Sequence, residues 1–112
     1  MQIRKKYKNV NPDLLYDDIK DFAVKQGLVV GEEKRQIYSI PTDSSSFINR
    51  GTIIFRGAGS EGEGVEYLRA HIEGSEKGET KLILDMNTDL FPQDKAMALQ
   101  SDLDFIFKPF EF

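Results

Sequence analysis

The chain has 112 residues, of which 39% are hydrophobic and 30% charged, with no cysteine and a net charge of −4. These values predict a single soluble globular domain over residues 1–112, not a disordered chain. The lack of cysteine excludes disulfides and thiolate metal sites and fits a cytoplasmic location. The acidic balance disfavours non-specific binding to nucleic acid or to anionic membranes. No apolar run approaches the roughly 20 residues of a membrane span, and no targeting leader is expected.

Residues 2–10 are predicted to form an edge strand. Ile3 and Tyr7 are its apolar anchors, and its basic residues are Arg4, Lys5, Lys6 and Lys8. Interleaved lysines discourage an edge strand from pairing with other chains. A basic arm that binds nucleic acid is the alternative, which the acidic segments further along the chain oppose.

A helix is predicted over residues 12–26. Asn11 can cap its first turn, Pro12 suits the first helical position, and Asp13 adds favourable negative charge. Gly27 supplies the left-handed residue that ends many helices. The buried face is expected to carry the apolar residues at helical spacing: Leu15, Ile19, Phe22 and Ala23.

The middle of the chain reads as a series of strands. Strands are expected at 28–30, 35–40, 52–55, 65–72 and 80–86, with a turn or bulge at 31–34, a polar loop at 42–46, a glycine-rich connection at 57–64 and a tight turn at 75–78. The connections between the last three strands are too short for crossover helices. These strands are therefore predicted to form an antiparallel meander.

A second helix is predicted over residues 92–107, beginning at Pro92 and stopped by Pro109. Its apolar stripe is expected to consist of Ala96, Leu99, Leu103 and Ile106. The aromatic residues of the tail, 110–112, are expected to pack back onto the fold.

Together these elements predict an α+β fold: a two-layer sandwich in which one antiparallel sheet of five or six strands carries both helices on one face, in the order β-α-β-β-β-β-α. This order resembles the TATA-box-binding-protein-like and helix-grip architectures. The resemblance concerns element order alone, and fold does not determine function.

The glycines at 57, 59 and 62 match the spacing G-x-G-x-x-G of dinucleotide sites. In such sites the glycines open a helix whose N-terminus faces the phosphates. Here another strand follows, and Glu61 and Glu63 would repel phosphate. The glycines are therefore interpreted as a hairpin connection, and no cofactor is expected.

Asp85, Asn87 and Asp89 have the spacing of the first three ligands of a calcium loop. That loop also needs a glycine at its sixth position and a glutamate at its twelfth, where this chain has Leu90 and Ala96. The three residues are instead expected to shape a strand-to-helix corner through side-chain bonds to backbone N–H groups.

His71 is the only histidine and has no recognisable nucleophile or carboxylate partner in the sequence. One histidine without cysteine also makes a zinc site unfavourable. His71 is interpreted as a solvated strand residue, and no catalytic or metal-binding residue is predicted.

The alternation of the last three strands predicts a second sheet face that no helix covers. Two sets of residues are expected on this face: the apolar Ile54, Val65, Tyr67 and Ile83, and the basic Arg56, Arg69, His71 and Lys81. Such a mixed face can bind a partner or be an ordinary solvated surface. The predicted partner-binding residues are Ile54, Arg56, Tyr67, Arg69 and His71.

Three functions follow as hypotheses. The preferred one is a non-catalytic domain that binds a protein partner or its own copy through this face. The first alternative is a helix-grip-like carrier or enzyme with an apolar cavity lined by Phe55, Leu84, Leu99 and Leu103. The second is a single-strand nucleic-acid binder that combines Arg56, Tyr67 and Arg69, which the acidic residues oppose.

Overall fold

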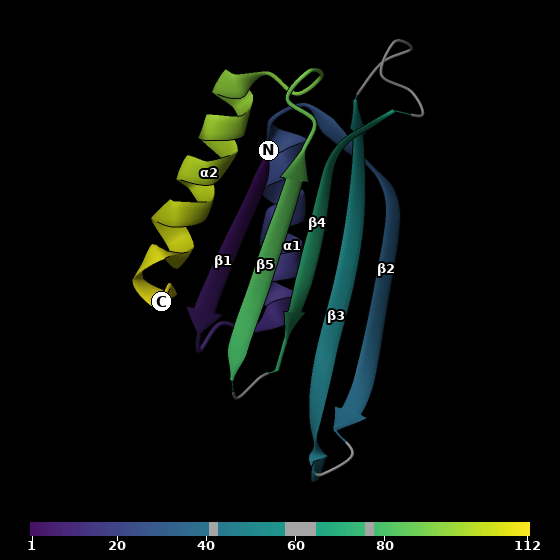
Figure 1. The fold of residues 1–112 in the computed structure, drawn as a ribbon, viewed down its shortest axis with the longest axis vertical. Helices are drawn as coiled ribbons and strands as arrows, with labels where there is room; N and C mark the ends of the chain where they lie inside the picture. Colours follow the sequence, from purple (N-terminus) through teal and green to yellow (C-terminus); the bar gives the residue numbers. More distant parts are fainter. Residues whose placement is uncertain (41–42, 58–64, 76–77) are drawn as a thin grey trace.

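The computed structural model describes residues 1–40, 43–57, 65–75 and 78–112, with the side chains of 39–47 excepted, and it shows an α+β fold (Figure 1). Its elements are β1 (Gln2–Lys8), α1 (Pro12–Lys25), β2 (Leu28–Ile40), β3 (Asp43–Gly57), β4 (Glu66–Gly74), β5 (Glu79–Met86), α2 (Gln93–Phe107) and the 3-10 turn η1 (Lys108–Phe110). The predicted element order and fold class are confirmed, with five strands in the sheet.

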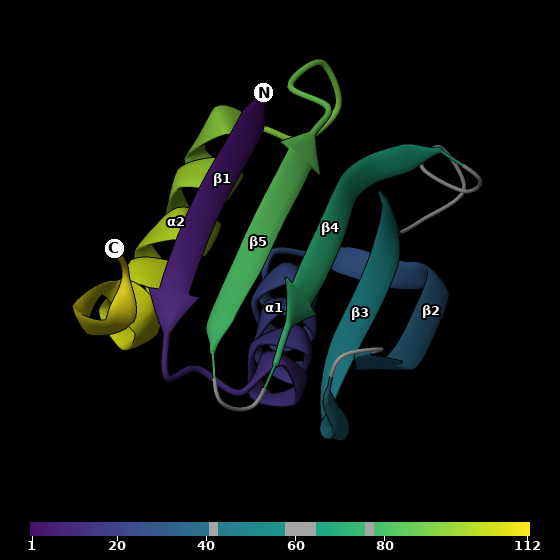
Figure 2. The same ribbon diagram turned by 60° about the horizontal axis from the view of Figure 1, so that its bottom comes forward.

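The strands form one antiparallel sheet in the order β1-β5-β4-β3-β2. The meander of β3, β4 and β5 is confirmed, and β1 returns from the start of the chain to pair with β5. Strands β1 and β2 therefore form the two edges, as predicted for β1. Figures 1 and 2 show that α1 and α2 both lie on one side of the sheet.

Helix α1 begins and ends as its sequence predicts. The side chain of Asn11 accepts a hydrogen bond of 2.9 Å from the N–H of Asp13, and Gly27 adopts a φ of +88° just beyond the helix. Its buried face includes Tyr16, which the sequence analysis did not place there, whereas Phe22 is only half-buried. In the described part of the chain, no helix is long and apolar enough to cross a membrane.

Helix α2 differs from its prediction in one buried residue. Ala96, Leu99 and Leu103 are buried as expected, but the fourth member of the stripe is Phe107, while Ile106 is 42% exposed. The ring of Phe107 packs on Tyr7 of β1, with the ring centroids 5.7 Å apart. Pro92 precedes the helix as its N-cap residue and is not its first helical residue.

Strands β2 and β3 are longer than predicted. Of the turn or bulge expected at 31–34, the structure shows the bulge, within a continuous β2 whose register shifts between Val30 and Glu32. The polar loop expected at 42–46 is wrong for residues 43–46, which belong to β3. The connection at 58–64 and residues 76–77 of the predicted tight turn lie outside the described residues.

The core lies between the helices and the inner side of the sheet. Its largest fully buried side chains are Tyr7, Phe55, Phe91, Phe107, Leu15, Ile19, Ile53, Leu68, Ile72, Leu82, Leu84 and Leu99. Alternate residues of β3, β4 and β5 supply much of this set, because successive strand side chains point to opposite faces. The same alternation directs the remaining side chains of these strands away from the helices.

A polar network joins α1 to β2 at the border of the core. The Tyr16 hydroxyl donates a hydrogen bond of 3.2 Å to Glu33, and the ammonium group of Lys20 lies 2.6 Å from the same carboxylate. The guanidinium of Arg35 lies 3.9 Å from the centre of the Tyr16 ring. Burial, reinforced by the Glu33 carboxylate, raises the pKa of Tyr16 to about 12, while the Lys20 hydrogen bond lowers the pKa of Glu33.

Candidate functional site

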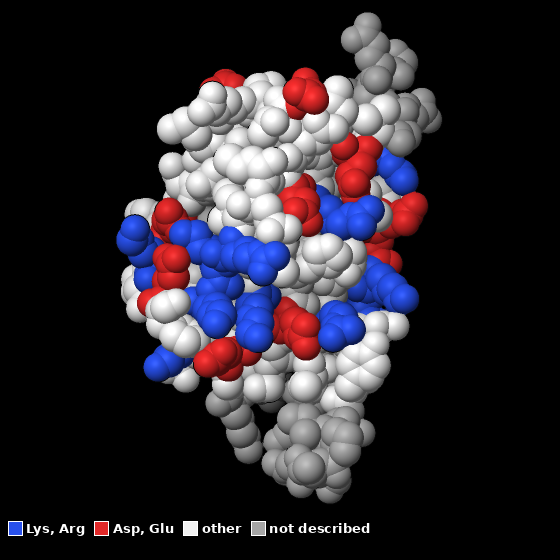
Figure 3. Space-filling view, in the orientation of Figure 1, with Lys and Arg blue, Asp and Glu red and all other residues white. Residues whose placement is uncertain are grey.

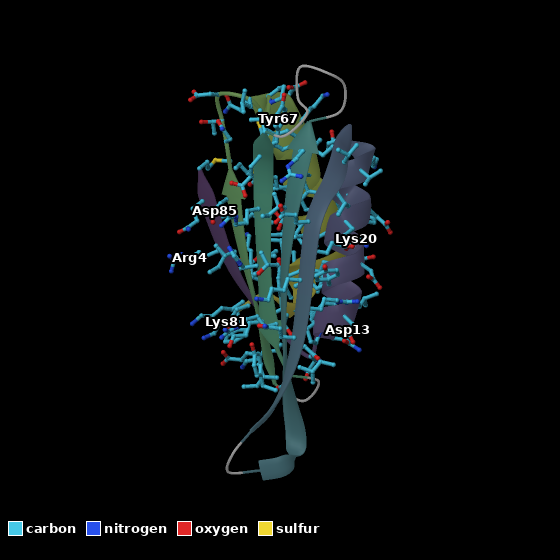
Figure 4. The ribbon with its side chains drawn as sticks, turned by 90° about the vertical axis from the view of Figure 1, so that its right-hand side faces the viewer. Arg4, Asp13, Lys20, Tyr67, Lys81 and Asp85 are labelled. Atoms are coloured by element: carbon cyan, nitrogen blue, oxygen red, sulfur yellow. The ribbon has the colours of Figure 1, made fainter. Side chains whose placement is uncertain are left out.

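The side of the sheet away from both helices, called here the open face, is the candidate site. Figure 4 shows Arg4, Lys81 and Asp85 pointing away from the helix side, where Asp13 and Lys20 lie. The strand register arranges the open-face side chains in rows across the sheet. Two complete rows are Gln2–Asp85–Arg69–Ile54–Glu32 and Arg4–Ile83–His71–Thr52–Lys34.

Four of the five predicted partner-binding residues lie together on the open face, on β3 and on the central strand β4. Ile54 lies opposite Arg69, and His71 lies opposite Thr52. All five are partly exposed: Ile54, Arg56, Tyr67, Arg69 and His71. The outward placement of Arg69 and His71 is explained by the complete burial of Leu68 and Ala70 on the other side of that strand.

The basic residues of this central region are paired within the chain. Arg56 lies 3.1 Å from Glu32, and Arg69 lies 2.7 Å from Glu66. The Nδ1 atom of His71 is 3.1 Å from the hydroxyl of Thr52. These contacts leave little uncompensated charge for an ionic partner at the centre of the face.

Tyr67 has a particular relation to the backbone of β3. The register of β3 and β4 shifts between Phe55 and Arg56, and the Tyr67 ring covers Gly57. A Cβ atom at Gly57 would lie 2.5 Å from Cζ of Tyr67, which is shorter than any normal contact. Gly57 pairs with the buried Leu28, so a Cβ here would point toward the core, and glycine leaves room for the Tyr67 ring on that side. Tyr67 accordingly packs on the core, and the prediction that it lies on the open face is wrong because the register shift interrupts the alternation of β4.

The remaining feature of the open face is a cluster of cations on β1 and β5, which we call the basic strip and define as Arg4, Lys6, Lys8 and Lys81. The first three alternate along β1, so their Cα atoms are separated by roughly 7 Å per step. Lys81 lies directly opposite Lys6 on the neighbouring strand. Figure 3 shows a broad blue band on this side of the face, whereas blue and red alternate on the β2 and β3 side.

The basic strip is not compensated by the carboxylates around it. None of its four members has an ion-pair partner among the residues that the structure describes. Glu79 lies opposite Lys8 without forming an ion pair, and Glu73, opposite Lys81, is 3.3 Å from Arg50. Asp85 accepts a hydrogen bond of 2.8 Å from Gln2. Because like charges directly opposite each other destabilise a sheet, the Lys6–Lys81 pair is a local cost to folding.

Comparison with family models, curated proteins and solved structures gives no match.

Other groups singled out in the sequence form no built site in the described residues. Within 1–40, 43–57, 65–75 and 78–112, no group of three His, Asp or Glu side chains is placed to hold a metal ion. The Asn87 side chain accepts a hydrogen bond of 3.1 Å from the N–H of Asp89, which is the corner-shaping contact that was expected. The glycine-rich motif from Gly57 to Gly62 lies outside the described residues beyond Gly57.

Sequence reasoning placed Lys81 on the open face but did not identify the basic strip. The alternating cations of β1 were noted and interpreted as protection of an edge strand. Their position beside Lys81 depends on the pairing of β1 with β5, which joins residues about eighty positions apart in the chain, as in Lys5 opposite Leu82. No local sequence pattern near either strand predicts this pairing register.

Proposed function

We propose that the protein is a non-catalytic binding domain whose open face binds a protein partner with an acidic contact surface. The observation that carries the proposal is the basic strip: four exposed cations on adjacent strands, two of them directly opposite each other, with no ion pair in the described chain. A partner carboxylate placed between Lys6 and Lys81 would relieve their repulsion and gain two attractive contacts. Ile83, between Arg4 and His71 in its row, supplies apolar contact beside the charges.

Charge favours a separate partner over self-association through this part of the face. A symmetric dimer places the same patch of each copy against the other. Centred on the basic strip, such a contact would oppose Lys6 and Lys81 to their own counterparts. Four of the predicted residues, Ile54, Arg56, Arg69 and His71, would then extend the footprint of the acidic partner toward β3.

The two alternatives receive less support. Phe55, Leu84, Leu99 and Leu103, which would line a ligand cavity, are fully buried members of one hydrophobic cluster. A nucleic acid would meet the same cations, but the net charge of −4 opposes its approach from a distance. The proposal keeps the likeness in element order to the TATA-box-binding-protein-like and helix-grip architectures. It also includes a cytoplasmic location, which the cysteine-free composition favours.

The test uses a fluorescein-labelled peptide in which Glu alternates with Thr, with a peptide of alternating Gln and Thr as the uncharged control. Fluorescence anisotropy is expected to show binding of the Glu peptide only, weakening as salt rises because the contacting charges are exposed. Replacing Lys6 or Lys81 by Gln should weaken binding by about two- to fivefold for each lysine. Lys34→Gln removes the same charge from the far edge of the same face and should leave the affinity unchanged.

Three results of the binding assay would overturn the proposal. Two of them are equal binding of the Glu peptide to the Lys6→Gln, Lys81→Gln and Lys34→Gln variants, and no binding of that peptide at low salt. The third is tighter, strip-dependent binding of a labelled oligothymidylate than of the Glu peptide, which would assign the strip to a single-stranded nucleic acid. Sedimentation of the unliganded protein as a dimer that Lys81→Gln stabilises would instead support self-association.

A further inference from the structure

The outer edge of β1 is partly covered by the end of the chain. The backbone N–H of Phe112 donates a hydrogen bond of 3.0 Å to the carbonyl of Lys6, and Glu111 forms an antiparallel bridge with Tyr7. Figures 1 and 2 show the C-terminus beside the end of β1. The expectation that the tail packs back is therefore confirmed for its backbone, although the side chains of Phe110 and Phe112 remain 44% and 52% exposed.

The side chains of this C-terminal segment show what kind of strand fits the β1 edge. The carboxylate of Glu111 lies 3.1 Å from the ammonium group of Lys5, which also approaches Asp104 at 3.7 Å. The ammonium group of Lys8 lies 4.7 Å from the centre of the Phe112 ring. An acidic residue and an aromatic residue in extended conformation thus contact lysines on the two faces of β1.

The rest of the β1 edge has no strand beyond it. Strand β1 is the last strand at one side of the sheet. In the described part of the chain, its outer side pairs with another segment at the bridge between Tyr7 and Glu111. The Lys6 carbonyl points outward, whereas the carbonyl of Met1 accepts a hydrogen bond of 2.8 Å from Met86 N–H on the inner side. By strand alternation, the backbone groups of Gln2 and Arg4 face outward with those of Lys6.

We propose that the β1 edge is a strand-addition site for an extended acidic segment of the partner protein, and that Glu111 and Phe112 occupy one end of this site until the partner displaces them. This inference rests on the proposed function and specifies how the acidic partner binds. An added strand places alternate side chains directly beside Arg4, Lys6 and Lys8 on the open face, where opposite charges stabilise cross-strand pairs. The basic strip and the outward-facing backbone groups of β1 then bind the same ligand.

Displacement of the C-terminal segment has a small cost. It holds β1 through one backbone hydrogen bond and a few side-chain contacts at the surface, and its two phenylalanine rings stay about half exposed. Edge strand β2 offers a longer edge, but its exposed run Glu32–Glu33–Lys34–Arg35 has mixed charge and selects no acidic ligand. Charge complementarity therefore favours β1.

The decisive variant is Phe112→Pro in the full chain, because proline removes the N–H that donates to Lys6. Glu111 already has φ −72° and ψ 142°, a conformation that suits a residue before proline. Phe112→Ala is the matched control, since it removes the same ring but keeps the donor. The Glu–Thr peptide is expected to bind Phe112→Pro about two- to tenfold more tightly than Phe112→Ala, the range that one net hydrogen bond provides.

A second comparison separates strand addition from charge attraction alone. A Glu–Thr peptide methylated on alternate backbone nitrogens keeps its carboxylates but loses its donors, and it should bind weakly. Hydrogen exchange at the Arg4 amide should slow with the unmethylated peptide and not with the methylated one. Equal binding of both peptides, with no difference between Phe112→Pro and Phe112→Ala, would overturn strand addition while leaving the proposed function standing. Failure of both peptides to bind would overturn both.

Discussion

Removing the charge of Lys81 should make the protein more stable, although it removes a side chain from the proposed binding site. Lys81 lies directly opposite Lys6, with Arg4 and Lys8 at the diagonal positions. Two unit charges about 6 Å apart repel by roughly 0.7 kcal/mol in water. Cross-strand pairs of like charge are measured in the same range. We therefore expect Lys81→Gln to raise the free energy of unfolding by about 0.5–1 kcal/mol at low ionic strength.

Salt provides an internal check on this reasoning. The screening length falls from about 10 Å at 0.1 M to about 3 Å at 1 M, so the gain should almost vanish at the higher concentration. Urea unfolding of both proteins at low and high salt measures the difference directly. Lys34→Gln is the matched control, because Lys34 lies opposite uncharged Thr52 and two residues from Glu32. That variant should be neutral or slightly destabilised.

The outcome that would refute the reasoning is a Lys81→Gln variant with unchanged or lower stability at low salt and the same difference at high salt. It would mean that the ammonium groups of Lys6 and Lys81 stay far enough apart that their repulsion does not lower the free energy of unfolding. A bound carboxylate would then have no repulsion to relieve. Increased stability together with weaker binding of the Glu–Thr peptide would indicate that the chain retains Lys81 for a ligand.

Two further predictions concern the helix layer. Because the pKa of Tyr16 is raised from 10.0 to about 12 in the folded state, the unfolded chain loses this proton first, and the free energy of unfolding should fall between pH 10 and 12. Urea unfolding across that range should show a shallower fall for Tyr16→Phe, by up to about 1.4 kcal/mol per pH unit, and an identical fall would contradict the assigned shift. In the second helix, Phe107→Ala should cost about 3–5 kcal/mol and Ile106→Ala less than about 1 kcal/mol in urea unfolding. Equal costs would restore Ile106 to the buried stripe.

The α2 stripe shows where sequence reasoning reaches its limit. A helix with 3.6 residues per turn places both Ile106 and Phe107 near the face defined by Leu99 and Leu103. Which of the two is buried depends on the strand beneath the end of the helix. That strand is β1, whose Tyr7 packs on Phe107. The burial of Phe107 in place of Ile106 therefore depends on a residue a hundred positions away in the chain, and the helical periodicity of the sequence cannot predict it.

Local signals were sufficient where the structure depends on neighbours in sequence. The capping side chain of Asn11 and the left-handed Gly27 lie at the predicted ends of α1. The alternation of β4 correctly placed Arg69 and His71 away from the helices, but not Tyr67, which lies at the register shift and packs on the core. At residues 31–34 local signals left a turn and a bulge both open, because a glycine followed by charged residues fits either, and the register with β3 decides for the bulge.

The same division applies to the candidate site. Four of the predicted partner-binding residues, Ile54, Arg56, Arg69 and His71, do share one face, yet the two arginines are already paired with Glu32 and Glu66. The uncompensated charge lies where β1, from the start of the chain, meets β5 from its second half. Strand β1 also contributes outward-facing backbone groups, which β3 and β4 cannot do because each has a strand on both sides. A ligand that uses both resources must be extended and acidic, so the position of β1 at the edge of the sheet determines the chemistry of the partner as well as its place of binding.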